Sequence, residues 1–331
     1  MDIVLTGIKP TGTLHIGNYV GAIKPAIAAS VQPGVDSYFF LADYHALGNE
    51  PEDLARWTLE IAASWLALGL DPDKVVFYRQ SDVPELLELA WILTSVTAKG
   101  LMNRAHAYKA AVDANIEAGA DPDQAILMNL YSYPILMAAD ILLFKAAKVP
   151  VGRDQKQHVE MARDIAQRFN HHYGETFVLP EALLRDEVEL LQGLDGRKMS
   201  KSYGNIIPIF ASEKELHKLV MKIKTNSLEP GQPKDTADSA LFAIYRAFAT
   251  AEETAAVAKR YAAGIGWGEM KQVLYERVNA ELAPARAEYE RLIAAPREVG
   301  ERLREGAQKA RAVSREFLAE IRERVGVRKL T

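Results

Sequence analysis

The sequence predicts an α/β protein, with a doubly wound parallel sheet followed by an all-helical domain. Short apolar runs alternate with helical stretches through the first half of the chain, which predicts parallel strands joined by right-handed crossovers. From residue 212 to residue 329 the pattern is helical, with no convincing strand. We therefore predict one domain over residues 1–207 and a second over residues 208–331.

The expected strands are short and apolar. They cover residues 3–6, 37–42, 75–78 and 149–151, with a possible fifth strand over residues 177–180. An alanine- and isoleucine-rich helix is expected to end near residue 30, amphipathic helices are expected over residues 51–70 and 155–170, and a strongly apolar helix over residues 130–144. A helical insertion over about residues 83–130 surrounds a polar, alanine-rich excursion at residues 114–125.

Composition excludes several classes of protein. The chain has 331 residues, of which 49% are hydrophobic and 25% charged, and it contains no cysteine. Disulfides, zinc–thiolate sites, iron–sulfur clusters and cysteine nucleophiles are therefore excluded. No apolar run reaches the roughly 18 residues of a membrane span, and the start lacks the basic segment of a signal peptide. The formal net charge of -4 does not by itself indicate a nucleic-acid partner.

A glycine-rich loop, residues 11–18 (TGTLHIGN), connects the first expected strand to the first helix. At this end of a parallel sheet a phosphate can meet a helix N-terminus, and Gly12 and Gly17 allow backbone N–H groups to approach an anion. His15 and Asn18 are neutral donors that can reach phosphate oxygens or a ribose. A glycine-rich turn with a surface histidine is the alternative interpretation.

A second loop carries the sequence KMSKS at residues 198–202. Lys198 and Lys201 are separated by small residues and flanked by glycines, which predicts a flexible cationic loop able to close over a polyphosphate. Taken alone, the motif fits a solvated basic loop equally well. When the two loops are considered together, their spacing and their order along the chain restrict the possible functions more than either loop does alone.

The pair of loops resembles the two signature motifs of class I aminoacyl-tRNA synthetases. Residues 134–142 (PILMAADIL) and 149–158 (VPVGRDQKQH) further resemble the tryptophanyl-tRNA synthetase family of bacterial type. The resemblance covers most of the chain and thins between Lys109 and Ala125 and after Ser227. It implies a Rossmann-like, HUP-type catalytic domain in which ATP and tryptophan form tryptophanyl-adenylate, and the amino acid then passes to tRNA(Trp).

The resemblance also implies a set of site residues around ATP. His15, Asn18, Lys198 and Lys201 would be the catalytic residues. Mg²⁺ would be bound through the ATP phosphates, because no cluster of acidic residues has the spacing of metal ligands. The ATP site would consist of Gly7, Lys9, Thr11, Gly12, His15, Gly17, Asn18, Gly152, Asp154, Lys198, Met199, Ser200 and Lys201. Lys9 stands where many relatives carry Gln, and Lys109 keeps one lysine of a pair that some relatives use near ATP.

Asp140 is the most informative residue of the expected tryptophan site. It interrupts an apolar helix, where a carboxylate is costly unless it is paired or hydrogen-bonded. A capping or ion-paired aspartate is the alternative; the resemblance implies that Asp140 accepts the indole N–H. The other expected members are Leu5, Met137, Val149 and Val151 around the ring, with His45, Tyr133 and Gln155 nearer the ammonium and carboxylate. For the apolar members, ordinary core packing is an equally simple explanation.

The C-terminal region is dense in arginine from Arg286 onwards, with interleaved glutamates that favour an ion-paired helix surface. The resemblance implies that residues 208–331 read the tRNA anticodon, that the protein is a cytoplasmic homodimer, and that helices between Val83 and Leu101 supply the interface. Three rival functions remain open. They are a tyrosyl-type synthetase, a small-molecule nucleotidyltransferase, and an inactive paralogue that binds RNA or protein.

Overall fold

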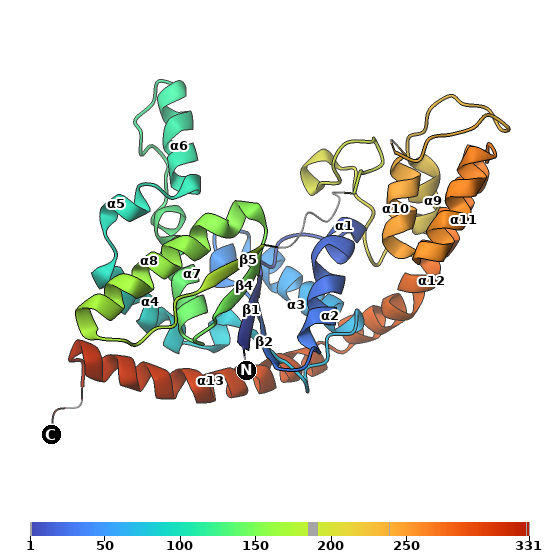
Figure 1. Cartoon of the computed structure of the whole chain (residues 1–331). Helices are drawn as coiled ribbons and strands as arrows, with labels where there is room; N and C mark the ends of the chain where they lie inside the picture. Colours follow the sequence, from blue (N-terminus) through green and yellow to red (C-terminus); the bar gives the residue numbers. More distant parts are fainter. Residues whose placement is uncertain (1, 185–190, 238, 329, 331) are drawn as a thin grey trace.

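Five parallel strands form one sheet at the centre of the computed structural model, which describes residues 2–184, 191–237, 239–328 and 330 (Figure 1). The strand order is β3-β2-β1-β4-β5, and every pairing is parallel. The strands are β1 (Asp2–Ile8), β2 (Val35–Leu41), β3 (Val76–Arg79), β4 (Lys148–Val151) and β5 (Glu181–Leu184). The predicted α/β class with a doubly wound parallel sheet is confirmed.

Sheet order defines where a ligand can bind. From β1 the chain moves outward to β2 and β3, and it then returns to place β4 on the other side of β1. The crevice at the carboxyl ends of β1 and β4 is therefore the topological switch point of the sheet. Residues 11–18 lie just beyond the carboxyl end of β1, and residues 149–158 begin within β4 and continue beyond its carboxyl end.

The predicted position of the fifth strand is wrong. The expected residues 177–180 are not extended into the sheet, and β5 begins at Glu181, whose N–H donates to Ala147 O at 2.9 Å. The side chain of Asn170 binds both the N–H and the C=O of Phe177, which ties this segment to the end of a helix. Pro180 has no N–H to contribute to a ladder, so pairing starts after it.

The helices of the first half cover both faces of the sheet. Buried positions run along both faces of β2, as expected for a strand covered on each side. A π-helical turn, Tyr19–Ile23, separates α1 from α2, and α6 continues the helix into residues 114–117, which the sequence assigns to the polar excursion. The helices are α1 (Ile16–Asn18), α2 (Lys24–Ser30), α3 (Pro51–Ala67), α4 (Glu85–Val96), α5 (Lys99–Met102), α6 (His106–Glu117), α7 (Met128–Leu142) and α8 (Lys156–Tyr173).

The described residues from 212 onwards form helices and no strand, as predicted. They are α9 (Glu213–Lys222), α10 (Ala240–Phe248), α11 (Ala251–Ala262), α12 (Trp267–Ala294) and α13 (Pro296–Val325). In Figure 1, α9 to α11 lie at the opposite end of the molecule from α4 to α8. No helix in the described part of the chain has the length and apolarity needed to cross a membrane.

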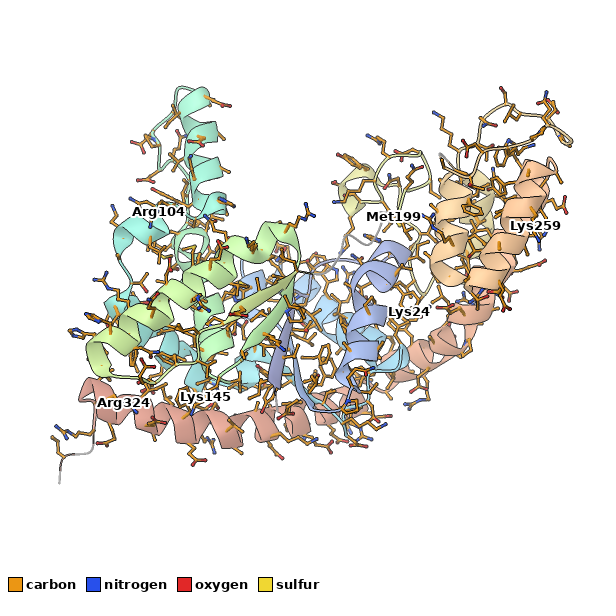
Figure 2. All side chains as sticks on the ribbon, in the orientation of Figure 1. Lys24, Arg104, Lys145, Met199, Lys259 and Arg324 are labelled. Carbon is orange, nitrogen blue, oxygen red and sulfur yellow. The ribbon has the colours of Figure 1, made fainter. Side chains whose placement is uncertain are left out.

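Helix α13 returns to the sheet and packs beneath it (Figure 1). Its residues Ala307, Ala310 and Phe317 are buried in the same cluster as Leu5 of β1. Lys145, seen beside α13 in Figure 2, places its ammonium 4.0 Å from the centroid of the Phe317 ring. Packing therefore crosses the division of the sequence at residue 207, and the last helix completes the core of the first region.

Ion pairs add to this packing. Arg311 and Arg315 both contact the carboxylate of Glu85 on α4, at 2.8 and 2.9 Å, and Arg322 pairs with Glu88 one turn further along. These three arginines belong to the basic C-terminal tract. The ion-paired interpretation of that tract holds for them, and their partners lie on the sheet domain.

Candidate active site

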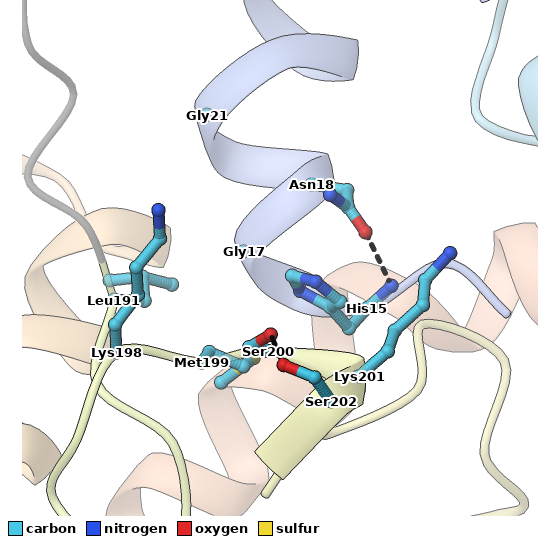
Figure 3. A pocket seen from close by; sticks show the side chains of 10 residues that line it. All are labelled: His15, Gly17, Asn18, Gly21, Leu191, Lys198, Met199, Ser200, Lys201 and Ser202. Carbon is cyan, nitrogen blue, oxygen red and sulfur yellow. Dashed lines mark hydrogen bonds between the residues drawn. The ribbon is translucent and has the colours of Figure 1, made fainter. Parts of the chain in front are cut away.

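The two motif loops meet at the switch point. Backbone hydrogen bonds join the first loop to residues 207–209, which follow the KMSKS loop: Ile16 N–H donates to Ile207 O at 3.0 Å, and Ile209 N–H donates to Leu14 O at 3.1 Å. Together they enclose a cavity of about 550 Å³ (Figure 3). Its lining residues are His15, Gly17, Asn18, Gly21, Leu191, Lys198, Met199, Ser200, Lys201 and Ser202.

His15 occupies the start of α1 and faces this cavity. Its backbone N–H donates to Asn18 Oδ1 at 3.1 Å, which leaves the Asn18 amide hydrogens available to a ligand. The ring is only 8% exposed, and its buried Nδ1 has no hydrogen-bond partner among the described residues. Burial, and secondarily the charge of Lys201, lower the pKa of His15 to about 4. His15 is therefore a neutral imidazole at neutral pH, as the sequence predicts, and it keeps one ring nitrogen for a ligand.

The two lysines of the KMSKS loop rise on either side of His15 (Figure 3). The ammonium of Lys201 donates to Thr11 O in the first loop, and burial lowers the pKa of this lysine. A Cβ at Gly12 would lie 3.2 Å from Lys201 Nζ, and Gly12 has a φ of 61°. Glycine at position 12 therefore allows both the positive φ of the turn and the close approach of the Lys201 side chain. The Lys198 side chain is exposed at the cavity rim.

The expected tryptophan site centres on Asp140, which is 1% exposed within α7. Gln80 Nε2 donates to both carboxylate oxygens, at 2.8 and 3.0 Å, and His45 Nε2 lies 2.9 Å from Oδ2. Burial raises the pKa of Asp140, and the hydrogen bonds from His45 and Gln80 act in the opposite direction. The carboxylate retains lone pairs for one further donor.

Of the polar residues expected near the ammonium and carboxylate of tryptophan, His45 contacts this carboxylate directly, and Tyr133 packs against His45. The Tyr133 ring meets the His45 ring edge-on, with centroids 6.3 Å apart. Tyr133 Oη also lies 2.5 Å from His158 Nε2. Gln155 bonds to Asp154 on one side and to His158 on the other. The structure thus connects Asp154 of the expected ATP site to Gln155 and Tyr133 of the expected tryptophan site.

The remaining expected residues divide into two groups. Leu5 and Val149 are buried, and Met137 and Val151 are partly buried against the same hydrophobic cluster. These four residues therefore fit both interpretations, ordinary core packing and the lining of a pocket for the indole ring. Lys9, Gly152 and Asp154 are exposed beyond β1 and β4. Gly7, at the end of β1, is also exposed, and a Cβ there would lie 2.8 Å from the Phe40 ring. Lys109 lies exposed on α6.

No group of three or more His, Cys, Asp or Glu side chains within the described residues is placed to hold a metal ion.

Comparison with known proteins decides the family. The sequence profile described as tRNA synthetases class I (W and Y) matches residues 2–283. The chain belongs to this family. A tryptophan–tRNA ligase of Neisseria meningitidis is 58% identical over 330 residues, covering 99% of this chain and 98% of that protein. One from Pseudomonas aeruginosa is also 58% identical, covering 99% of this chain and 74% of that protein. The resemblance to bacterial tryptophanyl-tRNA synthetases is confirmed.

Solved structures support the same family assignment for this synthetase. The tryptophanyl-tRNA synthetase of Campylobacter jejuni in complex with ADP and tryptophan is 45% identical, with a TM-score of 0.88 over 98% of this chain and 99% of that chain. The tyrosyl-tRNA synthetase of Archaeoglobus fulgidus shares the fold at 18% identity and a TM-score of 0.64.

Sequence reasoning missed three residues of this synthetase that organise the site. Gln80 is completely buried, and its Oε1 accepts the Tyr44 N–H at 3.0 Å while its amide nitrogen binds Asp140. Asp43 binds the Ser81 and Tyr44 N–H groups, which ties the ends of β2 and β3 together. The third residue, His158, stands within a quoted motif, and its spacing of three from Gln155 is the signal that could have found it.

Asn205 is a fourth missed residue, and it shapes the KMSKS loop of the synthetase. Its Oδ1 accepts the Ser200 N–H at 2.8 Å, and its Nδ2 donates to Lys198 O at 3.1 Å and to Asp195 at 2.7 Å. A Cβ at Gly193 would come within 2.4 Å of Asn205 Cγ. One buried amide therefore binds the loop backbone on both sides of Met199.

Proposed function

We propose that this synthetase joins tryptophan to ATP, releasing pyrophosphate, and then passes tryptophan to tRNA(Trp). The observation that carries the proposal is the convergence of His15, Lys198 and Lys201 on one cavity at the switch point of the sheet. The carboxylate of tryptophan attacks the α-phosphorus, and the bond to pyrophosphate breaks. A 3′-terminal ribose hydroxyl of tRNA later attacks the carbonyl carbon of tryptophanyl-adenylate, and AMP leaves. The Campylobacter relative was crystallised with ADP and tryptophan, the same two classes of ligand.

Catalysis by this chain consists of positioning and charge neutralisation. The neutral His15 ring and the Asn18 amide donate to phosphate oxygens, and Lys198 and Lys201 approach the pyrophosphate from the two sides of His15. No side chain forms a covalent intermediate. Mg²⁺, held through the ATP phosphates, would supply further charge neutralisation.

Selection of tryptophan rests on Asp140. Gln80 and His45 already donate to its carboxylate in the interior, where a remaining lone pair that finds no further donor is costly. The indole N–H is the one donor on a tryptophan side chain, and phenylalanine has none to offer. The pocket therefore binds an indole ring more tightly than an aromatic ring that has no hydrogen-bond donor.

Replacing Asp140 with alanine is expected to relax this selectivity. The ratio of kcat/KM for tryptophan over phenylalanine should fall by about 10²-fold or more, because a site built to bind a polar group rejects its apolar analogue by about 10⁴-fold. Amino-acid-dependent ATP–pyrophosphate exchange measures both values. Asp113→Ala on the exposed face of α6 is the matched control. Full discrimination in the Asp140→Ala variant would remove Asp140 from the recognition site.

The activity itself is tested by pyrophosphate exchange with each amino acid, followed by charging of tRNA. We expect exchange with tryptophan and none with tyrosine. Exchange with tyrosine would indicate the tyrosyl-type alternative. The absence of any amino-acid-dependent exchange would favour a small-molecule nucleotidyltransferase or an inactive paralogue.

The macromolecular partners are also proposals. We assign the anticodon to the helical region after residue 208, on the side formed by α9 to α11, because α13 is occupied against the sheet. A homodimer is supported by Leu87 and Trp91, which lie one turn apart on α4 and are 44% and 76% exposed. Charging of tRNA for translation places the protein in the cytoplasm.

A further inference from the structure

A chain of three hydrogen bonds links Asp154 of the expected ATP site to Tyr133, whose ring packs against His45. It runs from Asp154 through Gln155 and His158 to Tyr133. Gln155 is the last residue before α8, His158 lies in the first turn of α8, and Tyr133 comes from α7. His158 is 3% exposed, so water does not compete for its ring nitrogens.

The direction of the hydrogen bonds follows from the Asp154 end. A carboxylate has no hydrogen to donate, so the Gln155 nitrogen must face it, and Gln155 Nε2 lies 2.9 Å from Asp154 Oδ2. The amide oxygen of Gln155 is thereby turned toward His158, where it lies 3.0 Å from Nδ1. An amide oxygen can only accept, so His158 carries its hydrogen on Nδ1.

The second nitrogen of His158 is then an acceptor. Burial lowers the pKa of His158, which keeps the ring neutral and limits it to one hydrogen. Nε2 therefore presents a lone pair to Tyr133 Oη at 2.5 Å, and the tyrosine hydroxyl must donate to it. With its hydrogen committed to His158, the oxygen of Tyr133 offers lone pairs alone to anything else that approaches.

We propose that His158 is a positioning residue that makes the Tyr133 hydroxyl an obligate acceptor for the α-ammonium group of the substrate. An ammonium has three hydrogens and no lone pair, so it requires acceptors. A tyrosine free to rotate its hydroxyl could equally present its hydrogen, which would repel the ammonium. The inference rests on the proposed function, since it takes tryptophan as the ligand and Tyr133 as a neighbour of its ammonium.

The test compares tryptophan with 3-(indol-3-yl)propionate, which keeps the indole ring and the carboxylate but has no amino group. Dissociation constants are measured by isothermal titration calorimetry. His158→Phe keeps a ring of similar shape and removes the acceptor. We expect it to weaken tryptophan binding by about 10-fold or more, the usual effect of losing one charge-assisted hydrogen bond. Binding of the indolepropionate should change by less than about twofold on the same argument.

Three further variants sharpen the comparison. Tyr133→Phe should reproduce the selective loss, and the Tyr133→Phe/His158→Phe double variant should bind tryptophan no more weakly than Tyr133→Phe alone. His158→Gln can still accept through its amide oxygen and should restore most of the preference for tryptophan; it also serves if the phenylalanine variant does not fold. His172→Phe, at an exposed position of α8, is the matched control and should bind both ligands as the unaltered protein does.

The outcomes separate this inference from the proposed function. Equal weakening of both ligands by His158→Phe would overturn the inference, because it would indicate a general packing role. A selective loss in Tyr133→Phe with none in His158→Phe would also overturn it while leaving the proposed function intact. If Tyr133→Phe binds tryptophan normally, the ammonium does not lie beside Tyr133 and the inference fails, while pyrophosphate exchange with tryptophan tests the proposed function separately.

Discussion

Replacing Lys201 with alanine is expected to lower the rate of tryptophan-dependent ATP–pyrophosphate exchange by about 10²- to 10³-fold, the effect of removing one preorganised charge from a transition state. The Lys201 ammonium lies above the first loop, where it donates to Thr11 O, on the side of the cavity opposite Lys198. Charge grows on the pyrophosphate as it leaves, so the lysine stabilises the transition state more than bound ATP. Tryptophan affinity should barely move.

The measurement is the exchange rate at saturating tryptophan and ATP, with a calorimetric titration of tryptophan alongside it. Lys214→Ala is the matched control because it removes the same charge from an exposed position on α9, outside the cavity. An unchanged exchange rate in Lys201→Ala would contradict the role assigned to the KMSKS loop. A parallel loss of tryptophan affinity would instead point to a collapsed site.

The second large effect is expected for Gly306→Ala, which should destabilise the fold. Gly306 lies where α13 crosses β3, and a Cβ there would come within 1.8 Å of Phe77 O and 2.5 Å of Phe77 C. The obstacle is the backbone of a buried strand, so no side-chain rotation can relieve it. We expect a loss exceeding the ~1–3 kcal/mol of ordinary overpacking, because α13 must move away from the sheet.

Gly300→Ala is the control for this prediction on the same helix. A Cβ at Gly300 meets nothing within 4 Å, and alanine is the better helix former, so this variant should match or exceed the unaltered protein by up to about 1 kcal/mol. The midpoint of urea unfolding measures both variants. Equal midpoints for Gly306→Ala and Gly300→Ala would contradict the close contact of α13 with β3.

The motif loops were recognisable from the sequence because their function depends on local features. Glycines that allow close backbone approach, a histidine at a helix start, and lysines three residues apart are visible without a fold. Asp140 was recognisable for a related reason, since a charge within an apolar helix requires a partner wherever that helix lies. What each of these residues contacts was not visible.

The fifth strand and Gly306 show where local patterns mislead. Residues 177–180 have the apolar character of a strand, but the Asn170 side chain takes the N–H and C=O of Phe177. In the sequence, Gly306 is a residue that lowers the stability of a helix. In the structure, its lack of a side chain is what allows α13 to contact β3. In both cases a contact between separate elements overrides the local preference.

From the sequence alone one can predict the sheet class, the two loops that face phosphate, the acidic residue in the apolar helix, and the family to which they belong. The partners of these groups depend on the tertiary structure. Gln80 reaches Asp140 across 60 positions of the chain, and His158 reaches Tyr133 across 25. Such pairs form because parallel strands and their helices bring distant segments to one edge of the sheet. Hydrogen-bond direction, burial and pKa all depend on that juxtaposition, so no local pattern in the sequence encodes them.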